Sequence, residues 1–321
     1  MQDKPKVLLV GKVRERIAER LEGETEVVRC PAPLVAGALG PVLAAGIRGV
    51  AVSNTFGSAA IACLPNLEIV ANFGVGYDGI AVETAAARGV VVTNTPDVLN
   101  EEVADSAIGL LLNTLRRFPE AEAWLRDGRW ERSGAFPLSP LTLRGRSVGI
   151  YGLGRIGLAI ARRLEGFGVS ISYHTRTRKA GAPYVYHPTL LGMAEAVDTL
   201  IAIVPKTPDT YKTIDAPVLS ALGPNGVLIN VGRGWTVDED ALARALAAGT
   251  IAAAGLDVFQ DEPHVPDALL AAPNTCLLPH VASASVATRD AMADLVADNL
   301  LAWFRTGSPL TPVPETPVTR T

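Results

Sequence analysis

The sequence has few of the residues that form disulfide frameworks, metal centres or nucleic-acid surfaces. Among its 321 residues are only three cysteines and four histidines, and the cysteines lie far apart. We therefore expect no disulfide scaffold, no metal site and a reducing, cytoplasmic location. The 29 Lys and Arg residues are balanced by 33 Asp and Glu, so we also expect no nucleic-acid partner.

Long hydrophobic runs are lacking as well. Proline and glycine interrupt the uncharged stretch at residues 31–47, so we expect no membrane segment. Hydrophobic residues nevertheless make up 48% of the chain, which is enough for a large core. A chain of this length favours two domains over one.

Short β-branched runs alternate with helical patterns, which predicts an α/β fold with two parallel sheets. The first set of strands is expected at residues 7–10, 50–53, 69–72 and 90–93. The second set is expected at residues 147–151, 170–173, 199–204, 227–231, 253–258 and 276–278. Asn100 is a typical N-cap for a long connecting helix, and residues 285–304 are helical in pattern. Prolines from residue 309 onward predict a loose tail.

A glycine-rich segment directly follows the expected strand at 147–151. Gly152 allows a tight turn, Gly154 lets the backbone approach a pyrophosphate, and Gly157 allows close packing of the helical stretch expected at residues 158–164. Arg155 and Ile156, between these glycines, are also expected to bind the cofactor. The phosphates then face the helix N-terminus. This pattern predicts dinucleotide binding, with a plain glycine-rich turn as the alternative.

The segment after the next expected strand has no carboxylate to bind the ribose of NAD. It carries cations and hydroxyls instead: Thr175, Arg176, Thr177, Arg178 and Lys179. Arginine offers forked donors that suit a 2′-phosphate, so this segment predicts NADPH (NADP) as the cofactor in preference to NADH. The alternative is a solvated basic loop.

Further candidates for chemistry follow three strands of the second set. His280 follows the last strand, Arg233 follows the strand at 227–231, and Asp257 and Glu262 lie at and after the end of the strand at 253–258. Each alone is typical of a structural or surface side chain. Together they supply a cation for a carboxylate, an imidazole for proton transfer and a carboxylate to orient that imidazole.

With these residues, the chain resembles the D-isomer-specific 2-hydroxyacid dehydrogenase family. Within that family it resembles the glyoxylate and hydroxypyruvate reductase branch, which includes hydroxyphenylpyruvate reductases. Five motifs carry the resemblance, in the family's order: residues 72–78, 152–157, 231–234, 256–263 and 279–283. The resemblance implies that Arg233 binds the substrate carboxylate and carbonyl, and that Glu262 pairs with His280, the proton donor. It also implies that the backbone of Val75 and Gly76 holds the carboxylate.

The remaining site residues are expected from the same resemblance. Ser53 and Asn54 are expected to line the substrate side, and Asp257 to lie near the nicotinamide amide. His280 and Arg233 are also expected beside the cofactor, with Val103, Val204, Pro205, Thr207, Val231, Gly232 and Ala282. Lys206 is a cation that the sequence does not explain.

The resemblance also implies a domain arrangement. A discontinuous substrate domain is expected at residues 1–98 and 288–321, with a Rossmann coenzyme domain inserted at residues 99–287 and both sheets Rossmann- or flavodoxin-like. The active site is then expected in the cleft between the domains. The coenzyme domains of two chains are expected to form a homodimer through an arm at residues 124–141, to which Trp130 and Phe136 contribute unless they pack in the core.

The predicted function is NADPH-dependent reduction of a small 2-keto acid, glyoxylate or hydroxypyruvate, to the D-2-hydroxy acid. One alternative is an NAD enzyme that resembles phosphoglycerate dehydrogenase. Another is a dinucleotide-sensing binding protein that resembles the transcriptional corepressors of this fold, and turnover distinguishes it from an enzyme.

Overall fold

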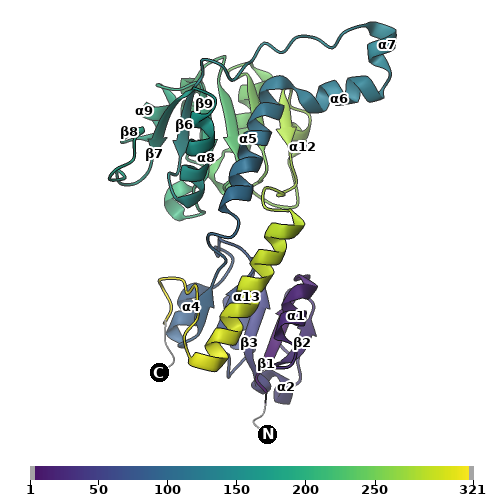
Figure 1. The fold of residues 1–321 in the computed structure, drawn as a ribbon, viewed down its shortest axis with the longest axis vertical. Helices are drawn as coiled ribbons and strands as arrows, with labels where there is room; N and C mark the ends of the chain where they lie inside the picture. The colour runs from purple at the N-terminus through teal and green to yellow at the C-terminus, as the bar shows by residue number, and fades with distance from the viewer. Residues whose placement is uncertain (1–3, 318–321) are drawn as a thin grey trace. The chain divides into compact units, whose positions relative to one another are not determined.

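The computed structural model describes residues 4–317, so residues 1–3 and 318–321, at the ends of the expected substrate domain, lie outside the described part. The chain divides into two compact units (Figure 1). Unit 1 comprises the described residues up to Leu99 and those from Ala284 onward, and unit 2 comprises Asn100–Ser283. Each unit contains one sheet whose strands are all parallel, which confirms the predicted fold class.

The sheet of unit 1 has five strands in the order β2-β1-β3-β4-β5. Their bounds are β1 Lys6–Val10, β2 Glu26–Cys30, β3 Ile47–Val52, β4 Ile69–Asn72 and β5 Val91–Thr93. The helices are α1 Glu15–Leu21, α2 Pro41–Gly46, α3 Ser58–Ala62, α4 Val82–Ala87 and α13 Val286–Thr306. The sequence pattern missed β2 because this strand lies at the sheet edge and only Cys30 in it is buried.

The segment after α13 is not loose, contrary to the expectation from its prolines. Val313 donates its N–H to the carbonyl of Val92 in β5, and its side chain is 1% exposed. The side-chain oxygen of the buried Asn299 accepts hydrogen bonds from the backbone N–H groups of Leu310 and Thr311. Proline prevents regular secondary structure here but still allows side-chain packing and single hydrogen bonds.

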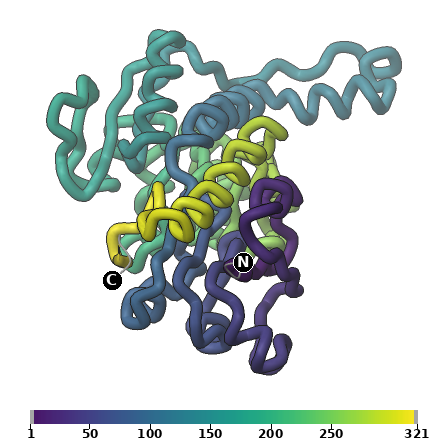
Figure 2. The backbone as a smooth tube through the Cα atoms, turned by 60° about the horizontal axis from the view of Figure 1, so that its bottom comes forward, coloured from purple at the N-terminus to yellow at the C-terminus, as the bar shows by residue number. Residues whose placement is uncertain are grey.

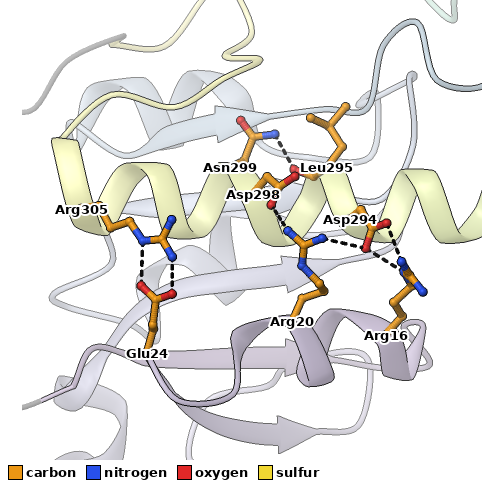
Figure 3. Close-up of polar contacts among 8 residues, drawn as sticks. All are labelled: Arg16, Arg20, Glu24, Asp294, Leu295, Asp298, Asn299 and Arg305. Carbon is orange, nitrogen blue, oxygen red and sulfur yellow. Dashed lines mark hydrogen bonds and ion pairs between the residues drawn. The ribbon is translucent and has the colours of Figure 1, made fainter.

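Ion pairs connect α1 to α13, the helices that lie side by side in unit 1 (Figures 2 and 3). The guanidinium of Arg16 binds both carboxylate oxygens of Asp294, at 2.7 and 2.8 Å. Arg20 contacts Asp294 and Asp298, and Arg305 pairs with Glu24. Opposite charges at successive turns therefore fix the register of the two helices.

The sheet of unit 2 has seven strands in the order β12-β11-β10-β9-β6-β7-β8. Their bounds are β6 Ser147–Tyr151, β7 Ser170–His174, β8 Val185–His187, β9 Thr199–Ala202, β10 Val227–Asn230, β11 Ala253–Leu256 and β12 Thr275–Leu277. The pattern missed β8, a three-residue edge strand with no buried residue. The helices are α5 Asn100–Arg116, α6 Phe118–Arg126, α7 Arg129–Ser133, α8 Arg155–Glu165, α9 Leu190–Ala194, α10 Ala216–Leu222, α11 Glu239–Ala247 and α12 Asp267–Leu270, with short 3-10 turns at Pro208–Thr210 and Gly234–Thr236.

Helices α6 and α7 form an arm that extends away from the sheet of unit 2 (Figures 1 and 2). Neither helix has a buried residue. Trp130 is 63% exposed, so it does not pack in the core, whereas Phe136 meets Trp124 edge-on at a ring distance of 5.7 Å. Among residues 4–317, no helix has both the length and the apolarity that spanning a membrane requires.

Candidate active site

The candidate catalytic side chains follow three adjacent strands of unit 2. Arg233 follows β10, Glu262 follows β11 and His280 follows β12, and these strands are neighbours in the sheet. Parallel strands end at the same sheet edge, so the order of the strands brings the three loops together. The sequence order alone separates them by up to 47 residues, from 233 to 280.

His280 and Glu262 form a hydrogen-bonded pair. Nδ1 of His280 lies 2.7 Å from Oε2 of Glu262, and the N–H of Phe259 donates to Oε1 of Glu262 at 3.0 Å. Burial opposes ionisation of Glu262. The hydrogen bonds from His280 and Phe259 and the charges of His280 and Arg233 outweigh that effect and lower the pKa of Glu262. Glu262 is therefore an anion that can orient the imidazole and hold its proton.

An apolar hollow of about 290 Å³ borders this pair. Its lining includes Phe259, Val265, Leu270 and Leu277 beside the two polar side chains. The pair itself remains open to solvent, since the side chains of His280 and Glu262 are 40% and 33% exposed. The hollow therefore borders a hydrogen-bonded pair that a small molecule can reach.

Asp257 holds the turn that carries His280. Its carboxylate accepts the N–H groups of Val281 at 2.7 Å and Ala282 at 2.9 Å, and its carbonyl accepts the N–H of His280 at 2.8 Å. His280 has a φ of 55°, a left-handed conformation that costs a residue with a side chain about 1 kcal/mol or more. Burial raises the pKa of Asp257 despite the two amide donors. The structure thus gives Asp257 a supporting role in addition to the cofactor contact expected from the sequence.

Arg233 lies in a turn that Asn230 shapes. Asn230, fully buried at the end of β10, accepts the N–H of Gly232 at 3.1 Å and donates to the carbonyl of Arg233 at 2.9 Å. A Cβ on Gly232 would lie 3.0 Å from the carbonyl oxygen of Val204, so the loops after β9 and β10 approach closely. Asn230 was not among the expected site residues, because a buried asparagine gives no sequence signal without its loop partners.

The glycine-rich turn has the geometry that a dinucleotide phosphate requires. Gly152 has a φ of 107°, and a Cβ on Gly157 would lie 2.1 Å from the carbonyl oxygen of Gly152. A Cβ on Gly154 would meet nothing within 4 Å, so the turn is open at the residue where a phosphate approaches. Gly154 is also the N-cap of α8 and supplies no capping side chain to the helix beginning at Arg155 and Ile156. These residues fit a bound pyrophosphate.

The basic segment follows β7, the strand beside β6 in the sheet. The side chains of Arg176, Arg178 and Lys179 are exposed. Among the described residues, none of these three cations has a carboxylate partner within ion-pair distance. Thr175 and Thr177 shape the turn through a hydrogen bond from Oγ1 of Thr175 to the carbonyl of Thr177. Three uncompensated positive charges thus lie one strand from the phosphate turn.

The other residues expected near the cofactor also lie in unit 2. Their positions are on α5, after β9, after β10 and after β12: Val103, Val204, Pro205, Thr207, Val231 and Ala282. The carbonyl of Ala282 accepts a hydrogen bond from Ser106 of α5. The structure accounts for Lys206, because its Nζ lies 4.6 Å from the ring centre of Trp235, a cation–π contact.

The substrate-side residues expected from the sequence lie in unit 1, after β3 and β4. Asn72, fully buried at the end of β4, accepts the N–H of Asn54 and donates to the carbonyls of Gly74 and Gly76. Asn94 donates to the carbonyl of Val75 at 2.8 Å. Within residues 4–317, the N–H groups of Val75 and Gly76 have no acceptor. Ser53 and Asn54 are exposed.

These contacts make the segment a candidate anion site. The asparagines bind three successive carbonyls and leave amide donors available for an anion such as a carboxylate. Asn72 begins the motif at residues 72–78 but had no expected role in the site, and Asn94 was not expected there at all. Their role depends on contacts with a loop that sequence spacing does not reveal.

Comparison with known proteins agrees with these features. Residues 108–282 match the family described as D-isomer specific 2-hydroxyacid dehydrogenase, NAD binding domain. The chain belongs to the D-isomer-specific 2-hydroxyacid dehydrogenase family, which confirms the resemblance and the prediction of an NAD(P)-dependent oxidoreductase.

Individual relatives are reductases of keto acids. Glyoxylate/hydroxypyruvate reductase A of Arabidopsis thaliana is 50% identical over 269 residues, 83% of this chain and 85% of that protein. Hydroxyphenylpyruvate reductase of Plectranthus scutellarioides is 48% identical over 84% of this chain and 86% of that protein. The crystal structure of NADPH-dependent glyoxylate/hydroxypyruvate reductase from Sinorhizobium meliloti with NADP and malonate is 65% identical, covers 99% of each chain and has a TM-score of 0.96.

Proposed function

We propose that this protein reduces a small 2-keto acid, glyoxylate or hydroxypyruvate, to the D-2-hydroxy acid with NADPH as the electron donor. The observation that carries the proposal is the pairing of His280 with Glu262, next to the loop of Arg233 and on the same sheet edge as the phosphate turn. The names of the relatives support the choice of substrate.

The proposed mechanism divides the work among three side chains. Nδ1 of His280 faces Glu262, so Nε2 is the atom that donates a proton to the substrate carbonyl oxygen. Glu262 keeps the imidazole oriented and protonated. Arg233 binds the carboxylate and the oxygen on which negative charge grows. A bound nicotinamide supplies the hydride that the carbonyl carbon receives.

Unit 1 is proposed to be the substrate domain. The amides of Val75 and Gly76 bind the keto-acid carboxylate, and Ser53 and Asn54 contact the rest of the substrate. Unit 2 is proposed to be the coenzyme domain. The preference for NADPH is proposed to come from Arg176, Arg178 and Lys179, which have no carboxylate nearby to repel a 2′-phosphate.

We also propose a homodimer formed through the arm of unit 2. Short helices without buried residues are unstable in isolation, so the arm needs a partner, and its exposed Leu125, Trp130 and Leu138 supply the apolar surface. Light scattering is expected to give twice the chain mass for the wild type and a lower mass for Leu138→Asp. Leu191→Asp, at an exposed position on α9, is the control. A monomeric wild type contradicts the dimer.

We also propose a cytoplasmic location, because the three cysteines are free and a reducing compartment keeps thiols in that state.

A steady-state panel tests the proposed activity. Glyoxylate, hydroxypyruvate and an aryl pyruvate are each assayed with NADPH and with NADH. The expected result is turnover with the two small acids and a higher kcat/KM with NADPH. If no keto acid supports NADPH oxidation while NADPH still binds, the protein is a dinucleotide-binding protein and the proposal is wrong.

A further inference from the structure

Glu239 is a buried carboxylate that the proposed mechanism does not use. It is the first residue of α11, where a negative charge suits the helix N-terminus, but such a residue is ordinarily solvated. Here it is only 7% exposed. Burial raises the pKa of Glu239, against the opposing effects of a backbone N–H and of Lys212, and with the added repulsion of Asp240 and Asp261. Burying a carboxylate costs free energy, so we expect the contacts of Glu239 to have a role in the protein.

The contact that Glu239 makes is with the loop of Glu262. Oε1 of Glu239 accepts the N–H of Gln260 at 2.7 Å. The preceding N–H, of Phe259, donates to Oε1 of Glu262. Two consecutive amides are therefore held by two carboxylates, one from α11 and one from the loop itself. The other oxygen of Glu262 contacts His280.

Gly234, the residue after Arg233, packs against the peptide bond between Phe259 and Gln260. A Cβ on Gly234 would lie 1.9 Å from the carbonyl carbon of Phe259 and 2.3 Å from the nitrogen of Gln260. Only a glycine allows so close an approach. The Phe259–Gln260 peptide is thus packed against the residue after Arg233 and hydrogen-bonded to Glu239.

We propose that Glu239 is a positioning residue for proton transfer: together with Gly234 it fixes the Phe259–Gln260 peptide and so sets the contact of Glu262 with His280. Glu239 touches no reacting atom and acts only through this peptide. The inference rests on the proposed function, since it concerns the same histidine and glutamate. Loss of the hydrogen-bond acceptor at Glu239 is therefore expected to weaken the hydrogen bond between Glu262 and His280.

The test measures the pH at which the His280 imidazole loses its proton, by NMR of the whole protein. With four histidines in the chain, His280→Gln identifies the signal. Glu262→Gln is expected to lower that pH, and Glu239→Leu, which keeps the volume but loses the acceptor, is expected to lower it less. Glu239→Gln keeps an acceptor and is expected to behave as the wild type, as is Asp240→Ala, an exposed neighbour.

The kinetic readout is the falling limb of keto-acid reduction at high pH. This limb is expected to move to lower pH in Glu239→Leu while KM for NADPH stays unchanged. If Glu239→Leu does not fold, Glu239→Asp, whose carboxylate is one methylene shorter, replaces it with the same expected direction.

The outcomes separate this inference from the proposed function. A folded Glu239→Leu with an unchanged His280 titration, while Glu262→Gln does shift it, overturns the positioning role and leaves the proposed relay intact. An equal fall in kcat at every pH also overturns it, because that result reports a structural effect alone. If Glu262→Gln shifts nothing, the proposed relay itself is wrong and the positioning role falls with it.

Discussion

Nδ1 of His280 lies 2.7 Å from Oε2 of Glu262, and the two side chains come from loops after adjacent strands. The orientation of the His280 imidazole therefore depends on the carboxylate of Glu262. The pKa of Glu262 is lowered, so in the folded protein this group keeps its charge to a more acidic pH than an ordinary glutamate. The pair is therefore intact across the neutral range and is lost as the pH falls through the lowered pKa of Glu262.

The pH dependence of Glu262→Gln follows from that charge. Removing the negative charge of Glu262 is expected to move the high-pH falling limb of keto-acid reduction to lower pH, since the carboxylate no longer favours the protonated imidazole. Initial rates of NADPH oxidation across a pH series measure the effect. Asp261→Asn, an exposed neighbour, is the control. An unchanged limb in Glu262→Gln means that Glu262 does not tune His280.

Arg233→Lys keeps the charge but removes the forked donors. A two-point contact with the carboxylate and carbonyl depends on that fork, so kcat/KM for the keto acid is expected to fall more than about tenfold. Arg244→Lys, an exposed position on α11, is the matched control. Near-normal activity of Arg233→Lys removes Arg233 from the site.

Coenzyme choice is expected to depend on the exposed cations after β7. Two or three charge-assisted contacts with the 2′-phosphate are expected to favour NADPH over NADH by at least about tenfold in kcat/KM. Replacing Arg176 and Arg178 with Ala is expected to erase most of this preference with little change in NADH kinetics. Added salt is expected to raise KM for NADPH more than KM for NADH. Arg144→Ala, an exposed cation before β6, serves as the control.

If the wild-type enzyme prefers NADH, the segment at residues 175–179 is a solvated basic loop. In that case the Arg176 and Arg178 substitutions leave the ratio of the two kcat/KM values unchanged.

The ion pairs between α1 and α13 predict a pH-dependent stability of unit 1. The hydrogen bond from Arg16 lowers the pKa of Asp294, so this carboxylate stabilises the fold above its ordinary pKa range, and the effect is lost as the pH falls. At neutral pH, Asp294→Asn is expected to lower Tm by roughly 1–3 °C, since partly exposed pairs contribute little each.

The Asp294 effect is checked by thermal melts at neutral and acidic pH. The difference from the wild type is expected to shrink in acid and in high salt. Glu22→Gln, at the C-cap of α1, is the control because its exposed carboxylate forms no ion pair within the described residues. Equal Tm values at neutral pH for Asp294→Asn and the wild type contradict the role given to these pairs.

Local signals predicted much of unit 2. The strand at 147–151, the glycines after it and the buried strands around it follow from short-range patterns, because a buried parallel strand is apolar throughout and a phosphate turn needs glycine at fixed spacing. Edge strands β2 and β8 carry exposed residues and lack that pattern.

Residues that position loops could not be predicted in the same way. Asn72 and Asn230 end strands in different sheets, and each binds the turn that follows it. Glu239 binds a loop 21 residues further along the chain. Each role depends on which loops meet after folding. The packing of the segment after α13 could not be predicted either. Its prolines indicate irregular structure, but they do not show that Val313 packs against β5.

The most direct test of the account is His280→Gln, assayed for NADPH oxidation with hydroxypyruvate and for NADPH binding by fluorescence. If His280 is the proton donor, the variant binds NADPH as the wild type does, and its kcat falls at least about a hundredfold. A His280→Gln variant that turns over at close to the wild-type rate contradicts the central claim.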